Sequence, residues 1–178
     1  MQAGKSSIQF EHPPIITSAA SIVGQTEGEG PLASFFDRVE PDPTFGKKSW
    51  EEAESELQRQ TVQKCLDKAG RQAADVNCLF AGDLLGQIVA TSFGVESFDI
   101  PFFGLYGACS TMGEAMILGA MAAGAGYADR VLALASSHFA SAERQFRFPL
   151  AYGNQRPQST TWTVTGCGCV MIEGNEKN

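Results

Sequence analysis

The residues of this sequence best suited to chemistry are Cys109 and its immediate neighbours. Cys109 lies in the segment Tyr106-Gly-Ala-Cys109-Ser-Thr111, between a predicted strand at 102–106 and a predicted helix at 109–126. A thiol at a helix N-terminus faces the positive end of the helix dipole and free backbone N–H groups, which favours the thiolate. A nearby glycine lets the backbone turn sharply, as a nucleophile elbow requires. The motif alone fits a small buried cysteine at the end of a core strand equally well.

Two more polar side chains, Asp83 and His138, are predicted at the same edge of the fold. Asp83 closes a buried strand that begins at residue 77, and His138 follows a strand at 130–136. Parallel strands present their carboxyl ends at one edge, where α/β proteins form pockets. Asp83 therefore either caps the helix predicted at 85–93 or lines that edge. His138 is either a hydrogen-bonded histidine in a strand-end loop or a ligand-binding group.

The elements that position these residues alternate between strands and helices. The predicted strands are at residues 14–24, 77–81, 102–106, 130–136 and 161–173, and the predicted helices are at 49–70, 85–93 and 109–126. The first helix has the clearest ends, because Ser49 and Glu52 form a capping box and Gly70 follows its last turn. Residues 26–48, rich in Gly, Pro and Asp, are predicted to form a loop with one short turn at 32–36. This order indicates an α/β fold, with parallel pairing where helices connect neighbouring strands.

The predicted helix at 109–126 is apolar on every side. Glu114 is its only charged residue, and small residues at 115, 119 and 123 permit close backbone approach. A helix of this composition is buried all round. We therefore expect cover on both of its faces, by two sheets.

The composition bounds the fold and excludes some functions. The 178 residues carry 13 Lys and Arg against 20 Asp and Glu, a net charge of −7, so no basic stripe is available for nucleic acid. A hydrophobic content of 43% excludes wholesale disorder. The five cysteines are odd in number and lack disulfide spacing, which indicates reduced thiols in a cytosol-like compartment. Cys167 and Cys169 lack the further ligands of a zinc site, so we expect them to pack in the core. No signal peptide or transmembrane segment is apparent.

Longer segments of the chain resemble the thiolase-like superfamily. The chain is similar to the N-terminal half of a thiolase-fold protein, in which the elbow cysteine begins a helix buried between two five-stranded sheets. Within that superfamily it most resembles the stage V sporulation protein AD family of endospore-forming bacteria. The segments that carry the resemblance are FEHPPIITSAASIVGQTEGEGPLASFFD, TFGKKSWEEAESELQ, LFAGDLLGQI, YGACSTMGEA, SSHFASAERQFRFP and RPQSTTWTVTGCG. The resemblance implies an α/β thiolase-like fold with a mixed sheet, of which residues 1–178 form the N-terminal half.

The same resemblance implies a function in sporulation and germination. It implies a protein that binds dipicolinic acid, with or without Ca²⁺, and supports its transport into the developing spore. The implied partners are other stage V sporulation membrane proteins, and the implied location is the cytoplasm or the periphery of the spore inner membrane. No cofactor and no resident metal are implied.

The resemblance also selects candidate ligand-binding residues. They are Cys109, Ser110, Thr111, Asp83, His138, Arg144 and Arg147. Helix N–H groups at 109–111 suit one carboxylate of dipicolinate, and the forked guanidinium groups of the two arginines suit carboxylates in general. The same arginines also fit a solvated loop. Asp83 repels a dianionic ligand unless it is protonated or bridged by a cation such as Ca²⁺.

The sequence departs from an active thiolase because the second half is absent. That half supplies the histidine and the second Cys or His that activate the elbow thiol, whereas the only histidines here are His12 and His138. We therefore expect no enzyme activity from this chain alone. The alternative is thiolase- or condensing-type acyl transfer through Cys109. A third hypothesis is a structural subunit that docks on a membrane channel through the 26–48 loop. We expect the missing layer to come from a longer chain or from a second copy in a homodimer.

Overall fold

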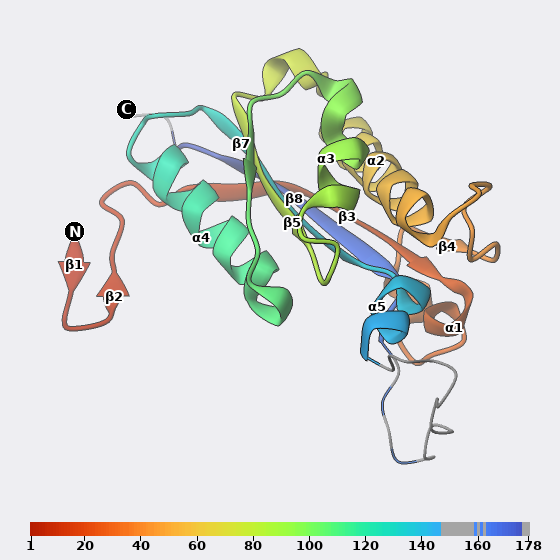
Figure 1. Ribbon diagram of the computed structural model, residues 1–178. Helices are drawn as coiled ribbons and strands as arrows, with labels where there is room; N and C mark the ends of the chain where they lie inside the picture. Colours follow the sequence, from red (N-terminus) through yellow and green to blue (C-terminus); the bar gives the residue numbers. More distant parts are fainter. Residues whose placement is uncertain (147–158, 160, 162, 176–178) are drawn as a thin grey trace.

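The computed structural model describes residues 1–146, 159, 161 and 163–175, and its centre is a six-stranded mixed sheet (Figure 1). In spatial order the strands are β4 (Arg38–Glu40), β3 (Ile15–Gly24), β8 (Gly166–Glu173), β7 (Arg130–Ser137), β5 (Cys78–Asp83) and β6 (Phe102–Gly104). Among these six, β8 alone runs antiparallel to its neighbours. The carboxyl ends of β5, β6 and β7 therefore meet at one edge, which we call the carboxyl-end edge. The predicted α/β fold with a mixed sheet is confirmed.

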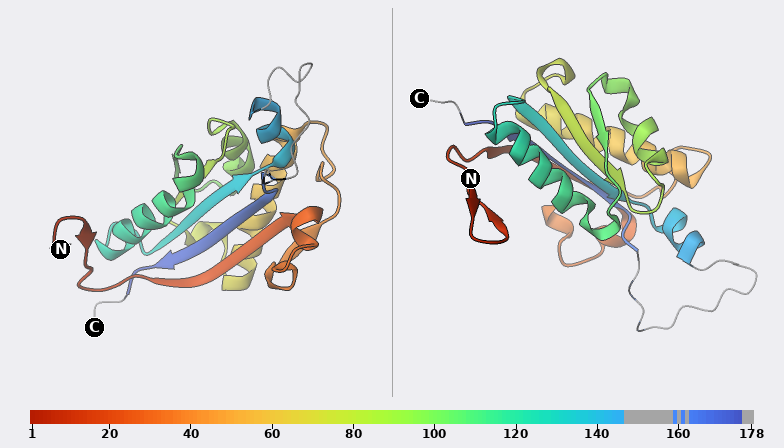
Figure 2. Two further views of the ribbon diagram at one scale, coloured as in Figure 1. Left: turned by 90° about the horizontal axis from the view of Figure 1, so that it is seen from below. Right: turned by 60° about the vertical axis from the view of Figure 1, so that its left-hand side comes forward.

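Helices cover both faces of the sheet (Figures 1 and 2). On one face lie α2 (Trp50–Ala69) and α3 (Val89–Val95), and on the other lies α4 (Thr111–Gly124). Strand residues alternate between the two cores, so that Leu132 and Leu134 pack with α2 whereas Val131 and Ala133 pack with α4. The short helices α1 (Gln25–Gly28) and α5 (Phe139–Phe146) lie at the carboxyl ends of β3 and β7. The N-terminal hairpin of β1 (Gln2–Ala3) and β2 (Ser7–Ile8) projects beyond the sheet.

The ends of α2 confirm the capping signals in the sequence. The Ser49 hydroxyl accepts a hydrogen bond from the Glu52 N–H at 3.2 Å, and the Glu52 carboxylate accepts one from the Ser49 N–H at 3.1 Å. Gly70 ends the helix in the left-handed region, with a φ of 63°. Glycine adopts this conformation at no steric cost. These local interactions fix where the longest helix begins and ends.

Four predictions about the other elements need correction. Residues 26–48 are not one loop, because they contribute to α1 and form β4, whose three residues become a strand by pairing with β3. The short turn at 32–36 is confirmed as a 3-10 turn at Ala33–Phe35. The residues after His138 form helix α5 rather than a loop, and α3 begins later than residue 85. The last strand begins at Gly166 and not at 161.

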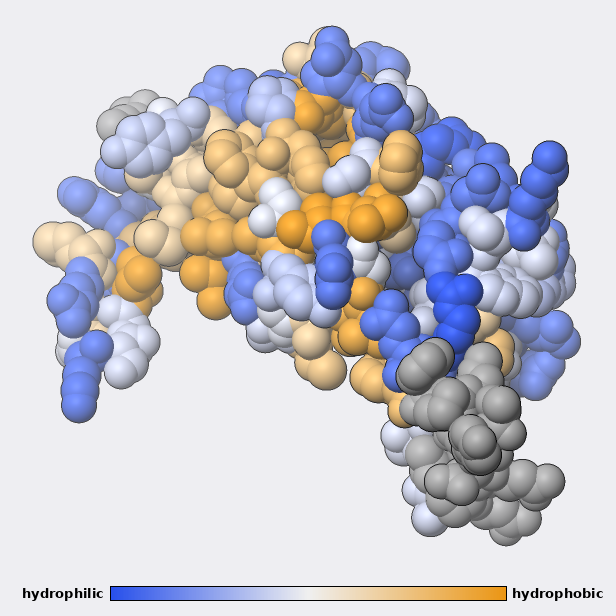
Figure 3. All heavy atoms as spheres, viewed as in Figure 1, coloured by the Kyte–Doolittle hydropathy of each residue, from blue (hydrophilic) through white to orange (hydrophobic). Residues whose placement is uncertain are grey.

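One side of α4 confirms the packing expectation and the other does not. Ala115, Gly119 and Ala123 are buried against the sheet, as their small size predicts. The expectation that the helix is buried on all sides is wrong for this chain, because Ile117 and Met121 on its outer side are 59% and 41% exposed. The inner side of α4 packs against β5, β7 and β8, and residues of the N-terminal segment, among them Ile8 and Phe10, line a groove with Met116, Ile117 and Met121. Figure 3 shows the resulting gathering of hydrophobic side chains on this face of the molecule.

None of the helices in the described residues combines the length and the hydropathy that a membrane span requires.

Candidate functional site

The segment that carries Cys109 is held against the end of β5 by a close backbone contact. A Cβ atom at Gly82 would lie 2.1 Å from the Leu105 carbonyl oxygen and 2.7 Å from Cγ2 of Thr111. Only glycine therefore allows the segment before α4 to cross this strand. The Leu105 N–H donates to the Ala81 carbonyl at 2.8 Å and fixes the crossing. The sequence signal for this contact is the glycine directly before Asp83.

The elbow presents Cys109 and Ser110 to solvent. Ala108 has a φ of 48°, in the left-handed region, and a 3-10 turn at Ala108–Ser110 leads into α4. The Cys109 side chain is exposed, whereas the other cysteines are buried. The Ser110 hydroxyl donates to the Gly107 carbonyl at 2.8 Å and also contacts Glu114. Of the two interpretations of Cys109, the structure favours an exposed elbow over a buried core thiol.

Thr111 is less available than its neighbours. Its hydroxyl donates to the Ala108 carbonyl at 2.9 Å and accepts from the Gly107 N–H at 3.3 Å, and its side chain is buried. Thr111 therefore shapes the elbow from inside. Its role as a direct ligand contact stays a prediction.

Asp83 lies at the carboxyl-end edge, with its side chain fully buried. In the pairing of β5 with β7 it is opposite Ser136, two residues before His138. Its carboxylate accepts hydrogen bonds from the Thr91 hydroxyl at 2.6 Å and from the N–H groups of Thr91 and Ile88 at 3.1 and 3.3 Å. Ile88 holds the N-cap position of α3, so Asp83 is not the N-cap that the sequence predicts, but its carboxylate still anchors the first turn of this helix. A contact between Asp83 and a ligand stays a prediction.

His138 is a buried histidine with both ring nitrogens occupied. Nε2 lies 2.8 Å from the Pro43 carbonyl oxygen, and Nδ1 accepts from the Ala140 N–H at 3.2 Å. Nε2 must therefore carry the proton that it donates to Pro43. The ring stacks on Trp50 with a centroid distance of 5.5 Å, and burial lowers the pKa of His138 below its usual value. Of the two interpretations, the hydrogen-bonded histidine is the one that the structure supports.

Of the two candidate arginines, Arg144 is described and Arg147 lies outside the described residues. Arg144 belongs to α5, and its guanidinium forms an ion pair with Glu51 near the start of α2. Its side chain remains 48% exposed. Arg144 thus lies near the N-terminal end of α2, which begins at Trp50 beside His138, and a partly exposed guanidinium can still receive a carboxylate.

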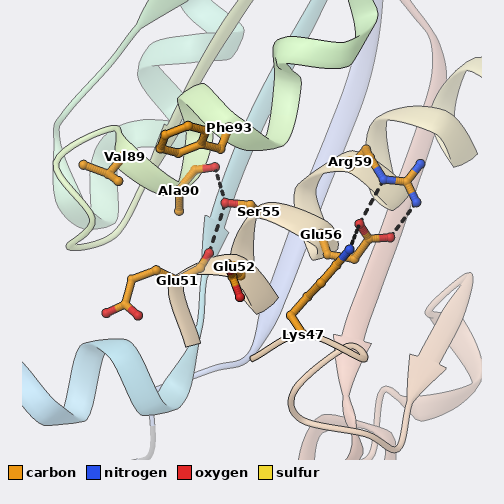
Figure 4. Close-up of a pocket in the computed structure, with 9 residues that line it drawn as sticks. All are labelled: Lys47, Glu51, Glu52, Ser55, Glu56, Arg59, Val89, Ala90 and Phe93. Atoms are coloured by element: carbon orange, nitrogen blue, oxygen red, sulfur yellow. Dashed lines mark hydrogen bonds and ion pairs between the residues drawn. The ribbon is translucent and has the colours of Figure 1, made fainter. Parts of the chain in front are cut away.

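A groove that the sequence did not predict lies between α2 and α3 (Figure 4). It encloses about 420 Å³, with Val89 and Phe93 on the α3 side and charged residues on the α2 side. Its charges are largely paired, because Glu56 binds both Lys47 and Arg59, and the Arg59 guanidinium lowers the pKa of Glu56 to about 2. The groove therefore offers a ligand no unpaired cluster of charge.

Sequence reasoning also missed a buried carboxyl group, Glu54, on α2. Glu54 is 2% exposed and contacts Ser136 and Ser141 at the carboxyl-end edge. Glu54, Gln58 and Thr61 recur at helical spacing beside the apolar stripe of α2 and are all buried. That helical spacing is the sequence signal from which these buried polar residues could have been predicted. In the described part of the chain, no group of three or more His, Cys, Asp or Glu residues is placed to hold a metal ion.

Solved structures that share this arrangement are condensing enzymes of thiolase-like fold. The priming β-ketosynthase of the R1128 polyketide pathway superposes with a TM-score of 0.61 at 15% identity, over 96% of this chain and 53% of that one. The 3-oxoacyl-[acyl-carrier-protein] synthase III of Aquifex aeolicus VF5 gives 0.60 at 14% identity, over 92% and 55% of the two chains. A variant form of OleA from Xanthomonas campestris gives 0.60 at 13%, over 93% and 60%. Identities this low establish the fold alone.

The sequence itself is similar to a narrower group of proteins. It is 43% identical over 169 residues to stage V sporulation protein AD of Bacillus subtilis (strain 168), covering 95% of this chain and 50% of that protein. The chain therefore spans about half the length of the curated relative that it matches. Residues 4–178 match the family described as Stage V sporulation protein AD (SpoVAD). Its thiolase-like fold and its sequence agree, and the chain belongs to the stage V sporulation protein AD family.

Proposed function

We propose that this chain binds dipicolinic acid beside Cys109 and supports its uptake into the developing spore without catalysing a reaction. The observation that carries the proposal is the exposed elbow at the start of α4, in a protein of a sporulation family. The N–H groups of Ser110 and Thr111 already donate to the Gly107 and Ala108 carbonyls, so the elbow attracts a carboxylate through the positive end of the α4 dipole. Arg144, at the same end of the molecule, adds a half-exposed guanidinium.

The state of the histidines supports binding over acyl transfer. A thiol nucleophile needs a nearby base. His138 is committed to Pro43 and Ala140, so its ring has no nitrogen left for Cys109. His12 lines a groove with Ala123 and Gly124, at the end of α4 opposite the elbow. Neither histidine of the chain is therefore available to activate Cys109.

Calorimetric titration tests the proposal. We expect saturable heat when dipicolinate is added to the chain, and a weaker response to pyridine-3,5-dicarboxylate, whose carboxyl groups diverge. Parallel titrations with and without Ca²⁺ measure the contribution of a bridging cation. Prior alkylation of Cys109 with iodoacetamide should abolish the heat, because the adduct occupies the elbow. Absence of saturable heat with and without Ca²⁺ rejects the proposal.

We also propose that the chain docks on membrane proteins of the same sporulation stage through the segment between β3 and α2. Two large apolar side chains there, Leu32 and Phe35, are 58% and 78% exposed. Co-purification of the membrane partners from sporulating cells should decrease in Phe35→Ser and persist in Cys109→Ala. Equal recovery with Phe35→Ser and the unaltered chain would contradict docking at this surface.

A further inference from the structure

A chain of polar side chains, all of them buried except the half-buried Ser141, joins α2 to the carboxyl-end edge. It consists of Glu54 and Gln58 of α2, Asp83 of β5, Thr91 of α3, Ser136 of β7 and Ser141 of α5, which we call the Glu54 cluster. Both of its carboxyl groups lie out of solvent, with Glu54 at 2% and Asp83 at 0% exposure. A buried carboxylate needs hydrogen-bond donors or a cation. The cluster contains few hydrogen-bond donors, and these must serve two carboxyl groups.

The hydrogen-bond donors distinguish the two carboxyl groups. Gln58 uses both amide hydrogens, one to Thr91 at 3.0 Å and one to Ser136 at 2.6 Å. The Thr91 hydroxyl then donates to Asp83 at 2.6 Å, and Asp83 receives two backbone N–H groups as well. Asp83 thus has the donor set of a carboxylate.

Glu54 has a different set of neighbours. The Ser136 hydroxyl donates to its Oε1 at 2.7 Å, and the Ser141 hydroxyl lies 3.2 Å from its Oε2. Ser141 has one hydrogen but two acceptors, since the His138 carbonyl oxygen is 3.0 Å away. With a proton on Glu54, Glu54 donates to Ser141 while Ser141 donates to the His138 carbonyl, which also accepts from the Ala142 N–H at 3.0 Å. Among the described residues, two hydroxyl groups and no cation contact this buried carboxyl, an environment that favours its protonated form, and Gln58 Oε1 stays without a hydrogen-bond partner.

The charges around Glu54 also favour its protonated form. Facing it are Asp83 on β5, Cys167 on β8 and Glu51 on its own helix, none of which is a cation. The neighbouring base, Arg144 of α5, is bound to Glu51, and the His138 ring is neutral because its Nδ1 accepts from the Ala140 N–H. Burial and the charge of Asp83 raise the pKa of Glu54 to about 7.

We propose that Glu54 is a positioning residue whose proton holds α5 and the His138 turn against α2. Glu54 reaches α5 through Ser141, and α5 carries Arg144, the candidate carboxylate partner. Loss of the proton leaves a buried charge beside Asp83, and separation of α5 from α2 relieves it. The ligand-binding consequence rests on the proposed function, whereas the effect on α5 does not.

The Glu54→Gln substitution removes the titratable proton but keeps both hydrogen bonds, because the amide donates to Ser141 and accepts from Ser136 at every pH. Glu96→Gln, at an exposed glutamate, is the matched control. Urea unfolding of the 178-residue chain should give equal midpoints for the unaltered chain and Glu54→Gln at pH 4. Between about pH 4.5 and 7 the unaltered chain should lose stability relative to Glu54→Gln, because the unfolded carboxyl ionises first. Above pH 7 the difference should level off.

Two further measurements report on the packing of α5 and on the affinity for dipicolinate. At pH 8, amide hydrogens of residues 138–146 should exchange faster in the unaltered chain and Glu96→Gln than in Glu54→Gln. Dipicolinate, ionised throughout, should bind the unaltered chain at least fivefold more weakly at pH 8 than at pH 6, and Glu54→Gln equally at both. Identical unfolding and exchange of Glu54→Gln and the unaltered chain at every pH would overturn the proposal. Differences in unfolding and exchange without dipicolinate binding to any variant would sustain the role of Glu54 and reject the proposed function.

Discussion

At the scale of single residues, the side chains at the carboxyl-end edge differ in whether their polar atoms already have hydrogen-bond partners. Cys109 and Ser110 are exposed. The Asp83 carboxylate is hydrogen-bonded to α3, and the His138 ring is hydrogen-bonded to the Pro43 carbonyl. The sequence placed reactive residue types at this edge. It could not tell which of them were free, because the partners lie far away in the chain, as Pro43 does from His138.

The first residue-level prediction concerns acyl transfer. Incubation with acetyl-CoA should leave the intact mass of the chain unchanged, because His138 cannot take the Cys109 proton. Iodoacetamide under native conditions is the positive control. It should add one adduct, at the exposed Cys109, and none in Cys109→Ala. A stoichiometric acetyl adduct at Cys109 would establish the enzyme alternative instead.

The second residue-level prediction concerns the role of Arg144 in binding dipicolinate. Arg144→Gln should weaken dipicolinate binding roughly tenfold, the effect of losing one charge-assisted hydrogen bond. Arg59→Gln is a closely matched control, because Arg59 is similarly exposed and also pairs with a glutamate of α2, but it lines the groove between α2 and α3. Titration calorimetry compares the two. Equal losses in both variants would mean that general charge, not the position of Arg144, controls affinity.

At the scale of elements, the sequence predicts what local chemistry determines. Ser49, Glu52 and Gly70 delimit α2 by contacts within a few residues, so their pattern is readable. Strand β4 was missed because its three residues depend on pairing with β3. Helix α5 was missed because it is short and anchored by distant contacts, such as Ser141 with Glu54. The site follows the same rule, since the elbow motif is local and the Glu54 cluster is not.

The crossing at Gly82 gives an element-level prediction. Gly82→Ala should destabilise the chain by about 1–3 kcal/mol or more, because the added methyl group meets the Leu105 carbonyl. Gly168→Ala, in β8 of the same sheet, has nothing within 4 Å of the added atom and should be nearly neutral. Urea denaturation of both variants measures the difference. Similar stabilities would show that the segment before α4 is not held against β5 as described.

At the scale of the whole molecule, the outer side of α4 is an exposed apolar face. Ile117, Leu118 and Met121 lie open on a helix whose inner side is packed against the sheet. A face of this kind is typical of an interface. We propose that a second layer, from a longer chain or a second copy, covers it in the working protein.

Sedimentation tests this proposal. The unaltered chain should self-associate, and a double substitution of Ile117→Lys with Met121→Lys should make it monomeric. Tyr127→Lys, in the turn after α4, is the control, because Tyr127 is 89% exposed but lies outside the helix. A well-folded, monodisperse monomer of the unaltered chain would contradict the need for a second layer.

The position at which dipicolinate binds distinguishes the Cys109 elbow from the groove between α2 and α3. Chemical-shift mapping of the isotope-labelled chain answers this most directly, since each backbone amide reports on its own surroundings. We expect dipicolinate to shift amide signals of residues 107–113 and 138–144, while those lining the groove between α2 and α3 stay unchanged. Shifts confined to that groove, or no shifts at saturating dipicolinate, would contradict a ligand site at the Cys109 elbow.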